Sequence, residues 1–165
     1  MPQSRLIAFK WVGVVVLFGM AGWRVWNWMG SDAGVSEKAF FYDLSEKRLF
    51  VADRGLIPPI AGVNDAVTDG VRAVVVSTNG HPEVRSTWVV AYLETNAPEL
   101  KEQLEAAKAA GRPPEIGRTA AQGLRLVRRP GDADWVSLGS PEGEQIVSEW
   151  LQFGTESSPP VICTP

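Results

Sequence analysis

The chain has one histidine, His81, and histidine is the side chain best suited to act as a base or a metal ligand at neutral pH. It lies in Asn79-Gly80-His81-Pro82, a composition typical of an exposed turn. A zinc site of the usual kind needs several His or Cys ligands, and the only other candidate is Cys163. The sequence contains neither the Gly-x-Ser-x-Gly pattern of hydrolases nor a glycine-rich phosphate-binding loop. We therefore predict no catalytic, cofactor-binding or metal-binding residues.

A glycine-flanked loop carries the oxygen-bearing side chains of Asn64, Asp65, Thr68 and Asp69. Such side chains are the ligands that calcium prefers. Their spacing does not fit the EF-hand pattern, and acidic residues are common in turns, where they accept local hydrogen bonds. We expect this loop to have a local structural role.

Three arginines, Arg125, Arg128 and Arg129, form a basic cluster on an expected hairpin. A basic cluster can contact lipid headgroups or an acidic partner. Asp132 and Asp134 follow closely and can balance this charge, which favours a solvated face of the hairpin.

The chain has a single cysteine, Cys163, so an internal disulfide is impossible. Two interpretations fit its position near the end of the sequence. The thiol either forms an intermolecular disulfide, or it is a small apolar side chain packed against the domain. The neighbouring Val161 and Ile162 favour burial.

Charge is distributed unevenly along the chain. All 19 Asp and Glu lie at or after Asp32, together with 13 of the 16 Lys and Arg, so this part has a net charge of −6. An acidic domain repels nucleic acid phosphates, and we expect no nucleic acid partner.

Several segments have the composition of strands. Residues 39–43 and 48–52 are rich in aromatic and branched side chains around a polar turn, which predicts a hairpin. Residues 54–70, with Pro58 and Pro59, read as an extended loop. The valine-rich residues 71–77 predict a central strand.

Residues 82–95 fit two patterns. Their composition suits a strand, yet Val84, Trp88, Ala91 and Thr95 recur at helical spacing, and we favour a helix. A second helix is expected from a cap at Asn96 to residue 110, followed by a loop over 112–123.

The remaining residues predict a hairpin, a helix and a tail. Residues 124–129 and 135–138 form the hairpin, and a last helix begins after the cap Ser140 and ends by Gly154. The proline-containing tail, 155–165, is expected to be extended. The fold class that follows is α+β: an N-terminal transmembrane helix, then a small domain with a mainly antiparallel sheet of about five strands and two or three helices.

Residues 11–29 are long and apolar enough to cross a membrane, since a helix of this length spans about 28 Å. Their one charge is Arg24, near the far end, where Trp23, Trp26 and Trp28 form half of an aromatic belt. Arg5 and Lys10 precede the span, and the acidic residues follow it. The positive-inside rule then places the N-terminus in the cytoplasm and the domain outside it.

The alternative is a cleaved signal peptide, because the uncharged stretch between Lys10 and Arg24 has the length of a signal core. The tryptophans and arginine that follow favour an anchor. The expected organisation is therefore a single-pass protein of the cell inner membrane, with the bilayer as one partner. Its parts are a cytoplasmic N-terminus (1–10), a transmembrane helix (11–29), a linker (30–37), an extracytoplasmic α+β domain (38–154) and a tail (155–165).

Three stretches carry a resemblance. They are Phe41-Tyr42-Asp43-Leu44 before Arg48-Leu49-Phe50, Ile57-Pro58-Pro59-Ile60 followed by Gly70-Val71-Arg72-Ala73, and Trp135-Val136 before Ser140-Pro141-Glu142-Gly143. Together they resemble a group of uncharacterised bacterial proteins with one N-terminal membrane span. Members of that group often carry cysteines after the strand that contains Gly-Val-Arg-Ala, where this chain has Thr78-Asn79-Gly80-His81. The resemblance covers most of residues 40–145 and implies an extracytoplasmic fold, with no known activity.

The sequence leads to three hypotheses of function. The first is a non-enzymatic, membrane-anchored accessory or interaction subunit of a larger envelope assembly, with protein partners there. The second is a minor pilin-like secretion component, although no glutamate follows a processing glycine inside the apolar run. The third is an extracytoplasmic small-ligand sensor or hydrolase that uses the Pro58-Pro59 loop and His81.

Overall fold

The computed structural model describes residues 36–64 and 67–165. Residues 36–165 form a compact unit of their own. The predicted cytoplasmic N-terminus, the predicted membrane span at 11–29 and most of the linker lie outside the described residues. None of the helices in the described part is both long and apolar enough to cross a membrane.

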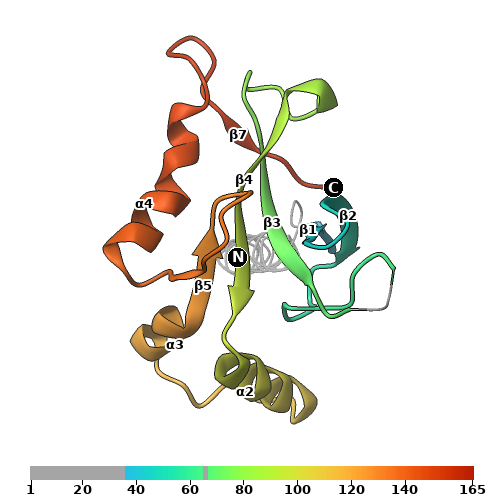
Figure 1. Cartoon of the computed structure of the whole chain (residues 1–165), viewed down its shortest axis with the longest axis vertical. Coiled ribbons are helices and arrows are strands. Elements are labelled where there is room, and N and C mark those ends of the chain that lie inside the picture. Colours follow the sequence, from blue (N-terminus) through green and yellow to red (C-terminus); the bar gives the residue numbers. More distant parts are fainter. Residues whose placement is uncertain (1–35, 65–66) are drawn as a thin grey trace, which may run out of the picture. The chain divides into compact units, whose positions relative to one another are not determined.

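The described part is α+β and is built on one sheet (Figure 1). Its strands run in the order β2-β1-β3-β4-β5-β6, with β7 paired to β3, and every pairing is antiparallel. The strands are β1 (Lys38–Asp43), β2 (Arg48–Asp53), β3 (Gly70–Ser77), β4 (Trp88–Asn96), β5 (Arg125–Arg128), β6 (Val136–Ser137) and β7 (Val161–Ile162). The hairpin of 39–43 and 48–52, the central strand at 71–77 and the hairpin of 124–129 and 135–138 are confirmed.

The sheet has seven strands where the sequence predicted about five, because one further strand was predicted as a helix and another lies in the tail, which was predicted only to be extended. The predicted helix over 82–95 is wrong: after a short 3-10 turn, η1 (Arg85–Thr87), the chain forms strand β4 between β3 and β5. Its burial follows the two-residue period of a strand, with Ala91, Leu93 and Thr95 buried. The other addition is β7, which lies within the predicted tail and is extended, as expected.

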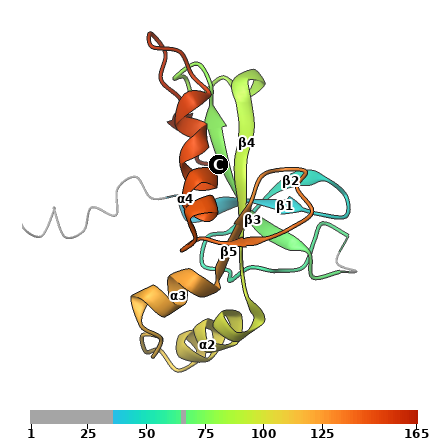
Figure 2. The same ribbon diagram turned by 60° about the vertical axis from the view of Figure 1, so that its left-hand side comes forward.

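Three helices accompany the sheet in the described residues: α2 (Pro98–Ala109), α3 (Arg118–Leu124) and α4 (Pro141–Glu149). Figures 1 and 2 show α2 and α3 together beyond one end of β4, and α4 alongside β4 and β5. Ser140 caps α4 as predicted, since its Oγ accepts from the Gly143 N–H at 3.1 Å, and the chain continues into η2 (Trp150–Gln152) before Gly154.

Two predictions about α2 and α3 are wrong. The first turn of α2 lacks the predicted side-chain cap at Asn96, because Ala97 precedes Pro98 and the Asn96 side chain donates to the Pro58 carbonyl instead. Residues 118–124, predicted as part of a loop, form helix α3.

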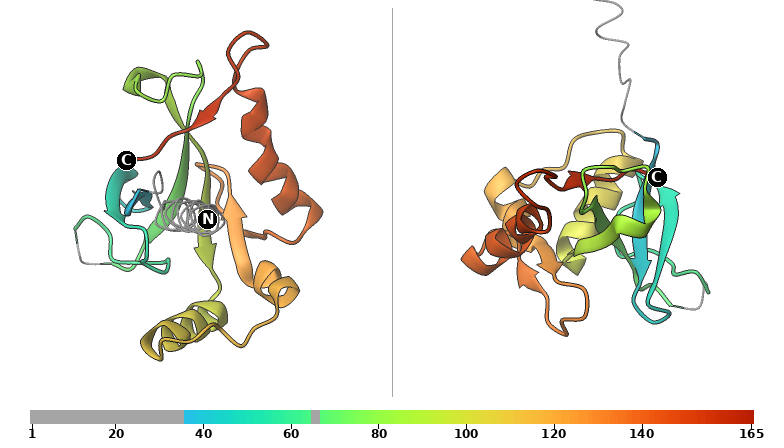
Figure 3. Two further views of the ribbon diagram at one scale, coloured as in Figure 1. Left: turned by 180° about the vertical axis from the view of Figure 1, so that it is seen from behind. Right: turned by 90° about the horizontal axis from the view of Figure 1, so that it is seen from above.

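The main apolar cluster lies on one face of the sheet. It joins Phe40, Val71, Ala73, Val75 and Leu93 with Cys163. Cys163 is buried, its N–H donates to the Val75 carbonyl, and burial raises the pKa of its thiol. Figure 3 shows the C-terminal segment crossing β3 toward the β1–β2 hairpin. The position of Cys163 agrees with the interpretation of a small apolar side chain packed against the domain.

Helix α4 approaches the sheet closely at Gly143. A Cβ at this position would overlap the Ser137 carbonyl and the Leu138 backbone, whereas a Cβ at Gly123 in α3 meets nothing within 4 Å.

We therefore expect Gly143→Ala to lower the free energy of unfolding by about 1–3 kcal/mol. Gly123→Ala, the matched control, should leave it unchanged or slightly raised because alanine favours helix. Urea unfolding of the full chain in detergent, followed by circular dichroism, measures both, and equal stabilities for the two variants would contradict the packing described.

Candidate functional site

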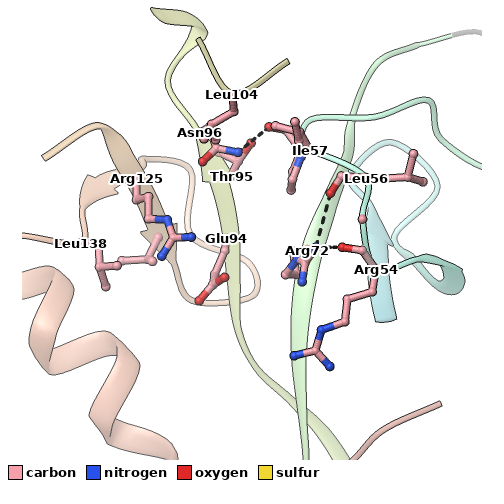
Figure 4. Close-up of a pocket in the computed structure, with 13 residues that line it drawn as sticks. Arg54, Leu56, Ile57, Arg72, Glu94, Thr95, Asn96, Leu104, Arg125 and Leu138 are labelled. Carbon is pink, nitrogen blue, oxygen red and sulfur yellow. Dashed lines mark hydrogen bonds between the residues drawn. The ribbon is translucent and has the colours of Figure 1, made fainter. Parts of the chain in front are cut away.

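The strongest candidate site is a pocket of about 270 Å³ on the face of the sheet opposite the main apolar cluster (Figure 4). Strands β3, β4 and β5 form its floor. The loop after β2 and helix α2 form its walls. The side chains and backbone that line it belong to Arg54, Gly55, Leu56, Ile57, Pro58, Arg72, Glu94, Thr95, Asn96, Leu104, Arg125, Val127 and Leu138.

Arg72 and Glu94 form the charged floor of this pocket. They lie directly opposite each other on β3 and β4, in a row that continues to Phe41 on β1 and Val127 on β5. Paired residues in such a row point to the same face of a sheet. The Arg72 guanidinium lies 5.5 Å from the centre of the Phe41 ring, which places a cation over an aromatic face.

The carboxyl group of Glu94 is partly desolvated. Burial raises its pKa, and the positive charges of Arg125 and Arg72 oppose that shift. Tyr92 lies two residues earlier on the same strand and therefore on the same face of the sheet. Burial and the Glu94 charge raise the pKa of Tyr92 to about 12, so this hydroxyl keeps its proton at neutral pH.

Two exposed arginines stand at the rim. Arg54 follows β2, and Arg125 begins β5 opposite Asn96. Figure 4 shows the Glu94 carboxylate between the side chains of Arg125 and Arg72. Yet no ion pair within 4.0 Å joins Glu94 to an arginine, and Arg54 and Arg125 have no carboxylate at that distance among the described residues.

The wall made by residues 54–59 is fixed by side chains that donate to its carbonyl groups. Arg72 Nη2 donates to the carbonyls of Arg54 at 2.7 Å and Leu56 at 3.4 Å. From the end of β4, Asn96 Nδ2 donates to the Pro58 carbonyl at 2.8 Å. Backbone groups of a loop need partners when solvent is excluded, and these contacts supply them.

Helix α2 fixes the same wall from the other side. Lys101 Nζ donates to the carbonyls of Ile57 at 3.2 Å and Pro59 at 2.7 Å, and Lys108 Nζ donates to the Gly55 carbonyl at 2.8 Å. The rim therefore rests on a loop held from three elements, β3, β4 and α2.

These residues suit recognition of a small anion with an apolar part. A guanidinium group binds a carboxylate or phosphate through two parallel hydrogen bonds. Three arginines against one glutamate leave the site positive, although the chain from Asp32 onward has a net charge of −6. The apolar share of the lining comes from Leu56, Ile57, Leu104, Val127 and Leu138.

His81 does not line this pocket. It lies exposed in the turn after β3, where its Nδ1 is 3.1 Å from Glu83 Oε1. The turn is organised by Asn79, whose Oδ1 accepts from the Ser77 hydroxyl and from the backbone N–H of His81. Gly80 at φ +75° allows that tight turn.

In the acidic loop, Asn64 and Asp69 make hydrogen bonds to the turn between β1 and β2. Asp69 Oδ2 accepts from the Ser45 N–H, and Asn64 Nδ2 donates to Glu46 Oε1. Asp65 lies outside the described residues. Within those residues, no three His, Cys, Asp or Glu side chains gather as metal ligands would.

The basic cluster of the sequence does not form one patch. Arg125 faces the pocket, whereas Arg128 lies over the Trp135 ring at 4.5 Å and donates to the carbonyls of Asp132 and Ala133. Arg129 forms an ion pair with Glu149 on α4, with 2.6 Å between Arg129 Nη2 and Glu149 Oε1. Arg125 and Arg128 therefore lie on opposite faces of β5, and Arg129 lies beyond its end.

Sequence reasoning missed Arg54, Arg72 and Glu94 as site residues. The available signal was a charged residue within an apolar strand: Arg72 interrupts the valine-rich run of β3, and Glu94 interrupts β4. Such residues must reach solvent, a partner or a pocket.

Comparison with known proteins adds no relative. No family model matches the chain, and neither a curated protein nor a solved structure matches it.

The wall of the pocket depends on Lys101. We expect Lys101→Met to lower the free energy of unfolding by about 1–3 kcal/mol, because two carbonyl groups lose a charged donor. Hydrogen exchange should quicken most at residues 54–60. Glu105→Gln, which removes only the exposed ion-pair partner of Lys101, is the control and should change stability little. Equal exchange at 54–60 in both variants would refute the proposed hold on the loop.

The raised pKa of Glu94 makes stability depend on pH. The native state holds this proton more tightly than the unfolded state, so stability falls as pH rises from the ordinary value of 4.5 through the native pKa. Glu94→Gln should remove that fall. Urea midpoints across this pH range compare the two proteins. A difference between them that does not change with pH would show that the carboxyl group is not desolvated.

Proposed function

We propose that the chain is a single-pass membrane protein whose extracytoplasmic domain is a non-enzymatic accessory subunit of an envelope assembly, and that it recognises its partner through the arginine-lined pocket. The observation that carries the proposal is the pocket itself, in which Arg54 and Arg125 flank the Arg72–Glu94 pair without an ion-pair partner within 4.0 Å among the described residues.

The membrane part of the proposal rests on sequence. Residues 11–29 are apolar with one terminal arginine and a cluster of tryptophans, and positive charge precedes them while acidic residues follow. Short loops rich in Lys and Arg stay in the cytoplasm, so this pattern supports a translocated domain at residues 38–154 and its tail.

The recognition part rests on the chemistry of the lining. Guanidinium groups on a fixed scaffold are over-represented where carboxylate or phosphate groups are bound. The scaffold is fixed by the three elements that hold residues 54–59. A partner with an anionic group would find its counter-charges already placed, which lowers the entropic cost of binding.

A second candidate function is a small-ligand sensor, which the pocket size favours. At about 270 Å³ the pocket is close to the small end of ligand sites, roughly 300–1,000 Å³. The hydrolase version of that hypothesis invoked His81, whose exposed position away from the pocket gives it no support.

Crosslinking in native membranes tests the accessory-subunit proposal. We expect the full chain to co-purify stoichiometrically with other envelope proteins. The double variant Arg54→Glu and Arg125→Glu should lose most of this recovery because both rim charges are inverted. The control is Arg112→Glu, an exposed residue beyond α2. A chain that always purifies alone, or that loses nothing on inversion of the rim, would refute the proposal.

A further inference from the structure

The pocket offers more positive charge than its own residues use. Arg72 donates hydrogen bonds from Nη2 to two backbone carbonyls, and its other guanidinium nitrogens have no acceptor among the described residues. The guanidinium groups of Arg54 and Arg125 likewise donate no hydrogen bond within the described part of the chain. Donors of this kind, placed around one cavity, match an anion with several acceptor oxygens.

Glu94 adds a different requirement. Its ionised carboxylate accepts hydrogen bonds and cannot donate them. A ligand bound between Arg125 and Arg72 comes close to this carboxylate (Figure 4). A purely anionic ligand would be repelled by it. A ligand that also carries an N–H donor next to its anionic group would satisfy it.

The apolar residues and the volume limit the rest of the ligand. Leu56 and Ile57 of the loop and Leu104 of α2 lie on the side of Arg72 and Asn96, and Leu138 lies on the side of Arg125 (Figure 4). A pocket of about 270 Å³ has room for one amino-acid-sized unit and not for a nucleotide cofactor.

We infer that this pocket binds an α-carboxylate with an N–H donor on the adjacent carbon and an apolar side chain, the chemistry of the C-terminal residue of a polypeptide. The arginines donate hydrogen bonds to the carboxylate, and Glu94 accepts one from the N–H. The leucine and isoleucine side chains of the pocket pack against the apolar part of the ligand. The inference rests on the proposed function, since the polypeptide end would belong to the partner subunit. A free amino acid has the same three features, and the test separates the two sources.

Other anions fit less well. Inorganic phosphate has no apolar part and places its charge against Glu94. A simple branched fatty acid fills the apolar wall but leaves Glu94 without the N–H donor. A buried acceptor left without a donor costs more than the bond is worth, so both should bind more weakly.

The test uses the full chain in detergent and follows its arginine side-chain N–H signals by NMR during titration. The probes share one carbon skeleton: N-acetyl-leucine imitates a chain end, leucine is the free amino acid, and isocaproate lacks the N–H. We expect N-acetyl-leucine to bind roughly fivefold more tightly than isocaproate. N-acetyl-leucinamide, which lacks the carboxylate, should give no saturable shift, and inorganic phosphate should bind more weakly than N-acetyl-leucine.

Variants assign the roles. Glu94→Gln should abolish the preference for N-acetyl-leucine over isocaproate, and Arg125→Gln should weaken both by about tenfold. Arg112→Gln, outside the pocket, should change neither. Tighter binding of N-acetyl-leucine than of leucine supports the chain-end source, and the reverse supports a free amino acid.

Absence of saturable binding by both leucine derivatives, equal binding of isocaproate, or tighter binding of phosphate would overturn the inference. This failure is distinct from failure of the proposed function. Loss of co-purification on inversion of the rim, combined with no binding of the leucine probes, would retain the accessory subunit and reject this ligand.

Discussion

The donation of hydrogen bonds from side chains of β3, β4 and α2 to the carbonyl groups of residues 54–59 is the interaction on which the pocket depends. This segment contains two adjacent prolines and cannot pair as a strand. Its carbonyls are instead satisfied by Arg72 from β3, Asn96 from β4 and the lysines of α2. The loop therefore packs against the sheet and closes one side of a cavity that would otherwise be an open sheet face.

Arg72 links this loop to the electrostatics of the site. It holds the loop through one guanidinium nitrogen, lies over Phe41, and stands opposite Glu94 in the sheet. A charge on a half-buried strand is costly unless it is compensated. Here the loop carbonyls, the aromatic ring and the neighbouring charge provide the compensation, and Arg54 and Arg125 remain available at the rim for a ligand.

Much of the fold could be predicted from the sequence because its signals are local. The aromatic hairpin around residues 44–47, the valine-rich β3 and the Ser140 cap each depend on neighbouring residues. Strand β4 was predicted as a helix because Trp88, Ala91 and Thr95 fit a helical period by coincidence. Its conformation is determined by pairing with β3 on one side and β5 on the other. β7 depends on a pairing with β3 that is distant in sequence.

The site was less predictable than the fold, for a physical reason. Arg72 and Glu94 meet only through the register of β3 and β4, and Arg54 joins them only because the loop folds back. The sequence grouped Arg125 with Arg128 and Arg129, yet strand alternation puts Arg125 and Arg128 on opposite faces, and Arg129 pairs with Glu149 on α4. The unusual feature that was visible, a charge within each of two apolar strands, identifies the floor of the pocket.

An NMR titration of the Glu94 side-chain carboxyl carbon, in the full chain and in Arg125→Gln, tests the pocket most directly. We expect a pKa of Glu94 above 4.5 in the unmodified chain, because the carboxyl group is desolvated on the floor of the pocket. We expect a still higher pKa in Arg125→Gln, because a stabilising positive charge is lost. A pKa at or below 4.5 that is insensitive to Arg125 would show that Glu94 faces open solvent and that the pocket does not exist as described.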